Sequence, residues 1–396
     1  MKKILFSLLI TVQAFAGSIG EDNNAFAFSL YSKIEKSDEN VVFSPYSIFT
    51  TLSLLYFGAE GQTAEEIKKV LHLSATKRPF LDAFATLQSG LTSTGDNGYR
   101  FTLATGLFPN KGTQFTKTFR EIAVGDFHAK IQALDYDLPQ SVTDTINDWI
   151  SEETNGYIPN LIHKQDINTA TRLVIANALF FEGAWMYPFP KEMTRKGTFV
   201  SRRGSSHQVE MMRQTRSLPY FSTDDVEGLF LPFARNSIHQ PQLQLLILLP
   251  KNNGSFPKLT QENLENWQSE TRSLLVSAQI PKFCFSKRIL LNTPLKELGM
   301  KDAFTYQADF SNINGMKDLF LNKVLHETYF SLDEKGVTAA SATAAILDVT
   351  SFSPTDEPPI PFIADHPFQF LLLDSHSGAI LFMGQVNHPA KECHEN

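Results

Sequence analysis

The residues of this sequence that come nearest to a catalytic motif are His326 and Glu327, the first two of the stretch HETYF. A zinc metalloprotease motif begins in the same way, but it needs a second histidine one helical turn later, where this chain has Phe330. The sequence also lacks a GxSxG nucleophile elbow, a GxxxxGK[ST] phosphate loop, a GxGxxG turn and a CxxC pair. We therefore predict that the chain is not an enzyme and that it uses no metal and no cofactor.

The residues around this motif alternate in the manner of a strand, with His326, Thr328, Phe330 and Leu332 on one face. Gly336 follows and, having no Cβ, allows the backbone to pivot. Continued past this glycine, the alternation puts Val337, Ala339, Ser341 and Thr343 on one face and Thr338, Ala340, Ala342 and Ala344 on the other. None of these residues is charged or larger than valine. Such a strand can slide between two existing strands without burying a charge, whose desolvation costs several kcal/mol.

Composition alone leaves a second interpretation of this segment open. Alanine is the best helix former, so the same residues could form an exposed helix or a flexible linker. Two threonines and a serine lower the helix propensity, and four prolines follow at positions 354, 358, 359 and 361. These features weigh against the helix without excluding it.

Composition places the chain among globular proteins, since 42% of its 396 residues are hydrophobic and 19% are charged. The net charge is −7, and no long run of Lys or Arg is present, so we expect no nucleic-acid partner. The two cysteines, Cys284 and Cys393, do not make a disulfide framework. We predict that both are free, because Cys393 lies three residues from the end. Asn253 begins the one glycosylation sequon.

The first 16 residues have the pattern of a secretory signal peptide. Lys2 and Lys3 precede an apolar core over Ile4–Val12, and Ala14–Ala16 provide a small-residue cleavage site. The alternative is a buried first helix. We predict that residues 1–16 are removed and that the protein is secreted, either extracellular or periplasmic. Later apolar segments are too short to span a membrane, so we expect no membrane association.

Helix signals crowd the first part of the chain and strand signals the later part. Ser44 is expected to cap a helix that ends at Gly58, and further caps are expected at Thr63, for a helix through Leu71, and at Ser141. Near-continuous apolar runs at 172–181 and 243–250 predict buried strands, and 368–374 with 379–386 predict a hairpin. This mixture indicates an α+β fold with large, mostly antiparallel sheets.

Six segments, taken in chain order, resemble the serpin family of serine-protease inhibitors. They are NVVFSPYSI (40–48), INDWISEETNGYI (146–158), VIANALFFEGAW (174–185), LGMKDAFTYQADFSNI (298–313), VLHETYFSLDEKGVTAASATAA (324–345) and FIADHPFQFLLLDSHSGAILFMGQV (362–386). The resemblance implies a single serpin domain over residues 17–396. It also implies a large, mostly antiparallel main sheet, two smaller sheets, about nine helices and an exposed reactive-centre loop at about 334–359.

The resemblance further implies a mechanism, in which a serine protease attacks the loop as a substrate and forms an acyl-enzyme with it. The cut loop then inserts into the main sheet and traps the protease, a mode for which serpins are a standard example of strand addition. Counting seventeen residues from Glu334 places the cut between Thr350 and Ser351. Three rivals remain: Asp348, Val349 and Phe352. Thr350 or Val349 would suit an elastase-like protease, which we favour, Phe352 a chymotrypsin-like one, and Asp348 an aspartate-specific one.

The family's functional regions can be assigned residue by residue. The hinge comprises Glu334, Gly336, Val337, Thr338, Ala339, Ala340, Ser341, Ala342 and Thr343. The "shutter", which lies under the point where the sheet opens, comprises Ser44, Ser47, Asn177 and His326. The "breach", at the top of the sheet, comprises Trp185 and Glu334. Val337 and Thr338 depart from the family's usual threonine and glutamate. Both are compatible with a strand, so we expect a monomeric inhibitor. The alternatives are a non-inhibitory serpin-fold carrier or binding protein and, less favoured, a hydrolytic enzyme.

Overall fold

The computed structural model describes residues 19–35, 38–91, 99–167, 171–235, 242–251, 255–337 and 358–389. Over these residues the chain has nine α-helices and two sheets, which confirms the predicted α+β class. Residues 19–34 are helical, and the other helices are α2 (Pro45–Gly58), α3 (Gly61–Val70), α4 (Lys77–Leu91), α5 (Lys117–Gly125), α6 (Pro139–Glu153), α7 (Gln261–Glu270), α8 (Asn292–Leu298) and α9 (Ser311–Asn314). Single 3-10 turns occur at η1 (Lys164–Asp166), η2 (Lys191–Met193) and η4 (Asp302–Phe304).

The larger sheet has nine strands in the order β1-β15-β14-β8-β7-β6-β9-β13, with β5 on part of β6. These strands are β1 (Val41–Phe43), β5 (Arg195–Val200), β6 (Ser206–Ser222), β7 (Val226–Pro232), β8 (Leu243–Pro250), β9 (Arg272–Pro281), β13 (Ile360–Ile363), β14 (Phe368–Asp374) and β15 (Ile380–Val386). The 17-residue β6 pairs with β5 and β9 along most of its length and with β7 only at residues 220–222. It therefore joins two smaller groups of strands into one hydrogen-bonded sheet.

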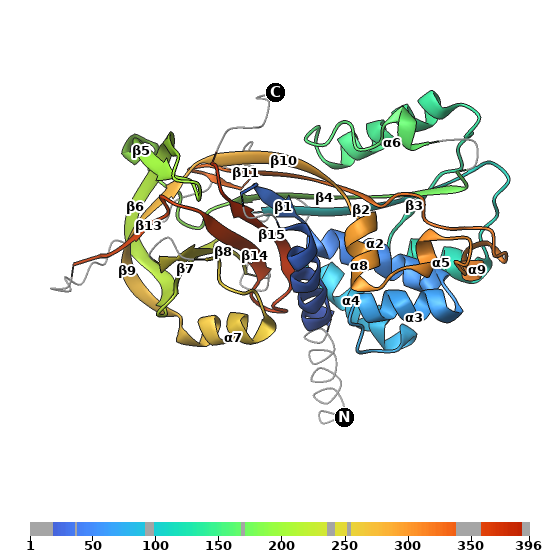
Figure 1. The fold of residues 1–396 in the computed structure, drawn as a ribbon, viewed down its shortest axis with the longest axis horizontal. Helices are drawn as coiled ribbons and strands as arrows, with labels where there is room; N and C mark the ends of the chain where they lie inside the picture. The colour runs from blue at the N-terminus through green and yellow to red at the C-terminus, as the bar shows by residue number, and fades with distance from the viewer. Residues whose placement is uncertain are drawn as a thin grey trace.

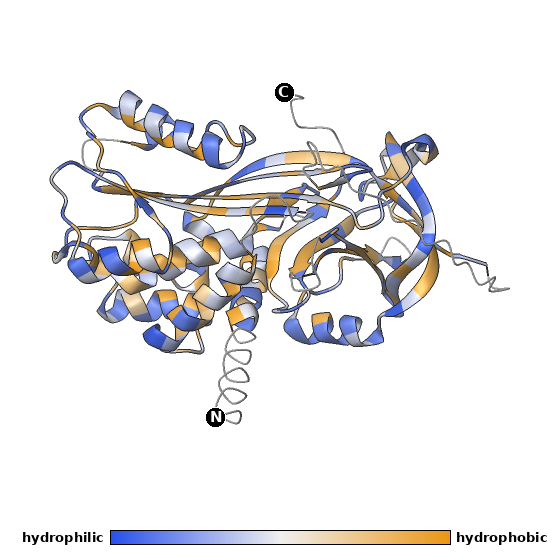
Figure 2. Ribbon diagram, turned by 180° about the vertical axis from the view of Figure 1, so that it is seen from behind, coloured by the Kyte–Doolittle hydropathy of each residue, from blue (hydrophilic) through white to orange (hydrophobic). Residues whose placement is uncertain are grey.

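The second sheet has six strands in the order β10-β11-β12-β4-β2-β3. They are β2 (Tyr99–Pro109), β3 (Lys130–Ile131), β4 (Leu173–Ala184), β10 (Phe283–Leu290), β11 (Leu325–Leu332) and β12 (Gly336–Val337). Figure 1 shows α6 on one face of this sheet and α2, α3, α4, α5 and α8 on the other. Two separate buried clusters correspond to these two faces. Figure 2 shows that hydrophobic residues concentrate along the strands and on the inward sides of the helices.

Helix α2 is the central helix of the molecule. All of its 14 residues except Thr51 are buried, and it packs against both sheets through β15 and β4. The Ser44 hydroxyl accepts a 3.1 Å hydrogen bond from the Ser47 N–H, which confirms the predicted cap, and the helix ends at Gly58 as expected. One buried helix thus holds the two sheets in a fixed relation.

Two predicted N-caps are wrong by three residues, because the observed N-caps are Glu60 and Leu138. Helix α3 begins at Gly61 because the Thr63 hydroxyl, expected to cap it, accepts a 3.0 Å hydrogen bond from the Asp309 N–H instead. Helix α6 begins at Pro139, whose fixed φ suits the first helical turn, and Ser141 therefore lies inside the helix. The predicted strands are confirmed as β4, β8, β11, β14 and β15.

The prediction that Cys284 is free is wrong, because this residue is disulfide-bonded and only 7% exposed. The prediction assumed that the C-terminal end does not dock. Asn40 nevertheless holds that end, because its side chain bonds to the Asn387 N–H at 2.7 Å and to the His388 N–H at 2.9 Å. Cys393, Asn253 and the signal peptide over residues 1–16 lie outside the described residues. No described helix is long and apolar enough to cross a membrane.

Candidate functional site

The predicted site lies where the six-stranded sheet is incomplete. Strand β12 contains only Gly336 and Val337, and it fits between the upper ends of β4 and β11. Val337 pairs with Gly183 on one side and with Leu332 on the other, and it is fully buried. Among the described strands, no ladder joins β4 to β11 beyond these two residues. The sheet is therefore filled at one end of the junction and unpaired along the rest.

A pocket of about 370 Å³ lies along this unpaired part of the junction. Both strands line it, through residues 173–175 and Asn177 of β4 and through Leu325 and His326 of β11. Helix α2 closes one side, and Leu161, Ile162, Asp166 and Ile167 contribute to another. The pocket thus lies at the end of the junction away from β12, which pairs with residues 183, 184 and 332.

Gly336 is required here by space. A Cβ on this residue would lie 1.9 Å from the carbonyl oxygen of Gly183 on β4, closer than any real side chain approaches backbone. The residue was predicted to act as a pivot, and the structure assigns it a second reason to be glycine, which is close contact with the neighbouring strand. Val337 follows it directly into the buried junction.

Four predicted shutter residues, Ser44, Ser47, Asn177 and His326, meet in one buried cluster beneath the junction. The Ser44 N–H donates to His326 Nε2 at 3.0 Å, and the Ser44 hydroxyl donates to the Leu381 carbonyl at 2.7 Å. The Ser47 hydroxyl donates to Asn177 Oδ1. The cluster therefore connects the N-terminus of α2 with both strands of the junction and with β15.

Two threonines that the sequence did not single out complete the cluster. Asn177 donates through Nδ2 to the Thr105 hydroxyl at 3.0 Å, and the Thr328 hydroxyl lies 2.7 Å from His326 Nε2. Complete burial lowers the pKa of His326 to about 3, so the ring is neutral near pH 7. Since Nε2 accepts the Ser44 N–H, the ring proton is on Nδ1. A histidine held in this way supports packing and provides no general base.

The predicted breach residues Trp185 and Glu334 lie together at the other end of the junction. The Trp185 indole donates to the Asp333 carbonyl at 2.9 Å, and its ring stacks on Phe233 with centroids 4.7 Å apart. The Trp185 backbone N–H donates to the Lys335 carbonyl at 2.8 Å. Trp185 therefore fixes the position of the chain that leads into β12.

The Glu334 carboxylate has two partners that the sequence did not indicate. It accepts a 2.8 Å hydrogen bond from the Thr194 hydroxyl and pairs with Lys282 at 3.0 Å. Burial opposes ionisation, but hydrogen bonds from its own backbone N–H, Lys282 and Thr194 hold the pKa of Glu334 below its ordinary value. Lys282 and Thr194 are far away in sequence, so no local pattern could identify them.

The remaining site predictions fall outside the described residues. These are Thr338, Ala339, Ala340, Ser341, Ala342 and Thr343 of the hinge, the reactive pair Thr350 and Ser351, and the rivals Asp348, Val349 and Phe352. The chain enters this segment from β12 in one sheet and leaves it into β13 in the other. Among the described residues, no group of three or more His, Cys, Asp or Glu side chains could hold a metal ion.

Comparison with known proteins identifies the family. Residues 21–389 match the family model described as "Serpin (serine protease inhibitor)". An uncharacterized serpin-like protein of Thermococcus kodakarensis is 35% identical, over 92% of this chain and 84% of its own length. The leukocyte elastase inhibitor of Bos taurus is 32% identical, over 93% of this chain and 98% of its own length. Each comparison spans almost the whole chain.

Solved structures agree with these matches. The thermophilic serpin tengpin, in its native state, superposes with a TM-score of 0.82 at 25% identity and 93% coverage of both chains. A highly specific serpin of the insect Tenebrio molitor gives a TM-score of 0.78 at 30% identity, covering 95% of this chain and 98% of its own. The chain belongs to the serpin family, whose members are in general protease inhibitors and not enzymes.

Proposed function

We propose that this protein is an irreversible suicide-substrate inhibitor of a serine endopeptidase. The observation that carries the proposal is the two-residue β12, which begins a strand between β4 and β11 and leaves the rest of the junction unpaired. Val337 leads directly from this strand into the uncharged hinge residues. Further residues of the same chain can therefore extend β12 without burying a charge.

The proposed reaction begins when the serine hydroxyl of a protease attacks the carbonyl carbon of Thr350. The bond to Ser351 breaks, its nitrogen takes up a proton, and Thr350 is left as an ester on the protease. Insertion of residues 336–350 along the junction would then carry the tethered protease about 50 Å, at ~3.3 Å per residue. Insertion must precede hydrolysis of the ester, which at ordinary turnover takes roughly a millisecond to a second.

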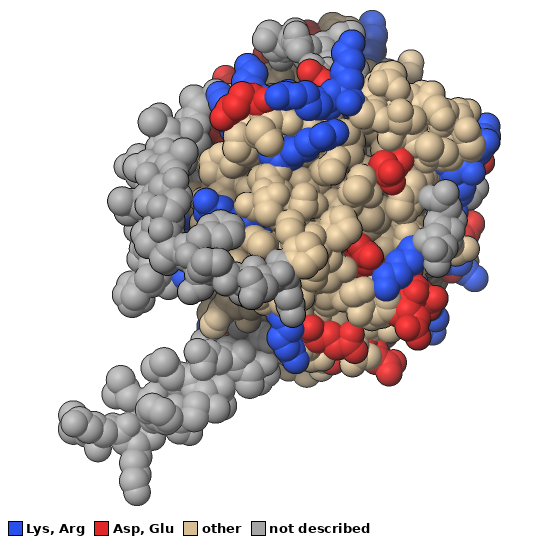
Figure 3. Space-filling view, turned by 90° about the vertical axis from the view of Figure 1, so that its left-hand side faces the viewer, with Lys and Arg blue, Asp and Glu red and all other residues tan. Residues whose placement is uncertain are grey.

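The preferred target is an elastase-like protease, with a chymotrypsin-like one second. Thr350 and Val349 are small enough for an elastase-type specificity pocket, and the elastase inhibitors among the relatives agree with this choice. Figure 3 shows the end of the molecule that carries β5, β6, β9 and β13, where an uncharged centre is surrounded by charges of both signs. We propose that the protein acts as a monomer after secretion, because residues 1–16 have a signal-peptide pattern.

Incubating the secreted protein with elastase-, chymotrypsin- and trypsin-like proteases tests the proposal. We expect one protease to form a complex that survives denaturing electrophoresis, and mass spectrometry of the C-terminal fragment to give the cut after Thr350. If every protease cuts the loop and remains active, the protein is not an inhibitor. A serpin-fold carrier would then be the better description, whereas turnover that survives loop cleavage would indicate a hydrolase.

A further inference from the structure

The connection from α6 to η1 crosses the outer face of the junction. We call residues 154–167 the strap. It leaves α6 through a left-handed turn, with φ of 52° at Asn155 and 82° at Gly156. Its residues Leu161, Ile162 and Ile167 line the pocket between β4 and β11. A strand that extended β12 would have to pass beneath the strap.

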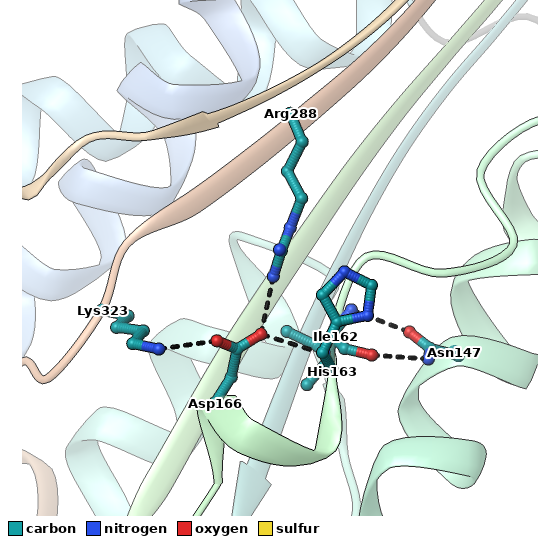
Figure 4. A network of polar contacts seen from close by, with 6 residues as sticks. All are labelled: Asn147, Ile162, His163, Asp166, Arg288 and Lys323. Carbon is teal, nitrogen blue, oxygen red and sulfur yellow. Dashed lines mark hydrogen bonds and ion pairs between the residues drawn. The ribbon is translucent and has the colours of Figure 1, made fainter.

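Hydrogen bonds at Ile162 attach the strap to helix α6, on the β4 side of the junction. Asn147 of α6 donates to the Ile162 carbonyl at 2.8 Å and accepts from the Ile162 N–H at 2.9 Å (Figure 4). Helix α6 packs in turn against β2 and β4. The strap is therefore held to α6 on the β4 side of the junction.

An aromatic contact carries the strap over the junction. The Tyr157 ring stacks on Phe180 of β4, with ring centroids 5.5 Å apart. It also contacts the Tyr329 ring of β11, with ring centroids 4.5 Å apart. One strap residue thus touches both strands that must separate when a new strand enters.

An ionic contact fastens the far end to the other side of the junction. The Asp166 carboxylate accepts hydrogen bonds from Arg288 of β10 at 2.6 Å, from Lys323 at 2.7 Å and from the His163 N–H at 2.9 Å (Figure 4). Its side chain is only 8% exposed, so water competes weakly for these bonds. Separating β11 and β10 from β4 stretches or breaks this contact.

Arg288 has a second carboxylate within its own sheet. It stands opposite Glu327 in the β10–β11 register, and cross-strand neighbours have Cβ atoms about 5 Å apart. Arg288 Nε and Glu327 Oε2 are both buried without a hydrogen-bond partner. An arginine that lets go of Asp166 can therefore pair with Glu327 by a side-chain movement alone.

We propose that Asp166 is a latch that sets the rate of sheet opening, and that opening transfers Arg288 from Asp166 to Glu327. The inference rests on the proposed function, because it concerns how fast the proposed insertion begins. In the closed sheet Asp166 holds the strap to β10 and to the approach to β11. In the open sheet the strap lifts with α6, and the new Arg288–Glu327 pair offsets part of the cost of losing Asp166.

Native-state hydrogen exchange on the uncut protein, followed by mass spectrometry, tests the latch. In Asp166→Asn the peptides covering 154–167 and 325–332 should exchange roughly tenfold faster, because two charge-assisted hydrogen bonds are weakened. In Glu327→Gln they should exchange more slowly, because the open state loses its ion pair. Asp135→Asn is the matched control, since its 3.0 Å pair with Lys111 does not reach β10 or β11, and it should leave both peptides unchanged.

The proposal is overturned if Asp166→Asn exchanges at the wild-type rate, if Asp135→Asn has the same effect, or if Glu327→Gln is faster than wild type. If Asp166→Asn does not fold, Lys323→Gln removes one donor at a more exposed position and should accelerate exchange in the same peptides. These measurements need no protease. If the wild-type protein forms no protease complex, the inhibitor proposal is contradicted. The latch proposal is decided separately, by the exchange rates.

Discussion

At the scale of single residues, the junction is held closed at both ends by side chains from distant parts of the chain. Glu334 pairs with Lys282 where β12 begins, and His326 accepts the Ser44 N–H beneath the unpaired part. Both groups are buried and both have shifted pKa values of known direction. Each therefore gives a prediction with a defined pH dependence.

Glu334→Gln should lower the free energy of unfolding by about 1–3 kcal/mol, because it removes the charge that Lys282 faces. Glu210→Gln is the control, since Glu210 lies 3.7 Å from the same lysine but is more exposed, and we expect little effect. The Glu334 pKa is lowered by folding, so its contribution is complete above the ordinary value of 4.5 and is lost as the pH falls through the lowered value. Urea unfolding across this pH range measures both effects, and equal losses in the two variants would contradict the assignment.

The lowered pKa of His326 predicts a second pH dependence of the free energy of unfolding. Folding lowers its pKa from 6.5 to about 3, so the unfolded chain binds a proton that the folded protein excludes. Stability should therefore fall as the pH drops from 6.5 towards 3, by at most about 1.4 kcal/mol per pH unit. In His326→Asn this part of the slope should disappear. A variant with the wild-type pH profile would show that another group is responsible.

The sequence predicts these residues unevenly. Ser44, His326 and Glu334 could be located because a helix cap, a strand alternation and a family motif are local patterns. Lys282, Thr194 and Asp166 could not, because a charge pair between distant segments leaves no periodic signal in either. Thr63 shows the opposite error, since its capping pattern is present but its hydroxyl bonds to Asp309.

At the scale of elements, β12 is the part on which the proposed mechanism depends. It joins the sheet with two residues, of which Val337 is fully buried between β4 and β11. Position 335, two residues earlier, is exposed. Two arginine substitutions can therefore be compared, one at the buried position 337 and one at the exposed position 335.

Val337→Arg should convert the inhibitor into a substrate. Position 337 is already buried in the uncut protein, so an arginine there must either be buried as a charge or displace β12 from the junction. Either outcome slows the extension of β12, so hydrolysis of the acyl-enzyme should be faster than insertion. Lys335→Arg retains the charge at an exposed site and should inhibit as the wild type does. The ratio of cleaved protein to trapped complex on a denaturing gel measures the outcome. Unchanged trapping by Val337→Arg would contradict insertion through this junction.

At the scale of the whole molecule, the incomplete six-stranded sheet means that the uncut protein lacks a strand its fold can accommodate. Filling the junction adds a ladder on both β4 and β11 and buries small side chains from the loop. Under the proposed mechanism, the uncut form is a kinetically trapped state. In that mechanism, the strap and the two clusters at the ends of the junction keep the sheet closed.

Limited proteolysis within 338–357 should therefore raise the melting temperature. An added central strand that contributes about 5 kcal/mol would raise it by roughly 6 °C for a chain of this size. Scanning calorimetry of the uncut and cut proteins measures the difference. A cut protein that melts no higher than the uncut one would show that no free energy was stored.

The position of β14 and β15 has a consequence for what happens after cleavage. Both strands follow the reactive-centre loop in the chain. They lie inside the nine-stranded sheet between β8 and β1, and all of their residues are buried. After cleavage behind Thr350, the two fragments should therefore remain associated. They should elute together in size-exclusion chromatography under native conditions and separate only in detergent or denaturant.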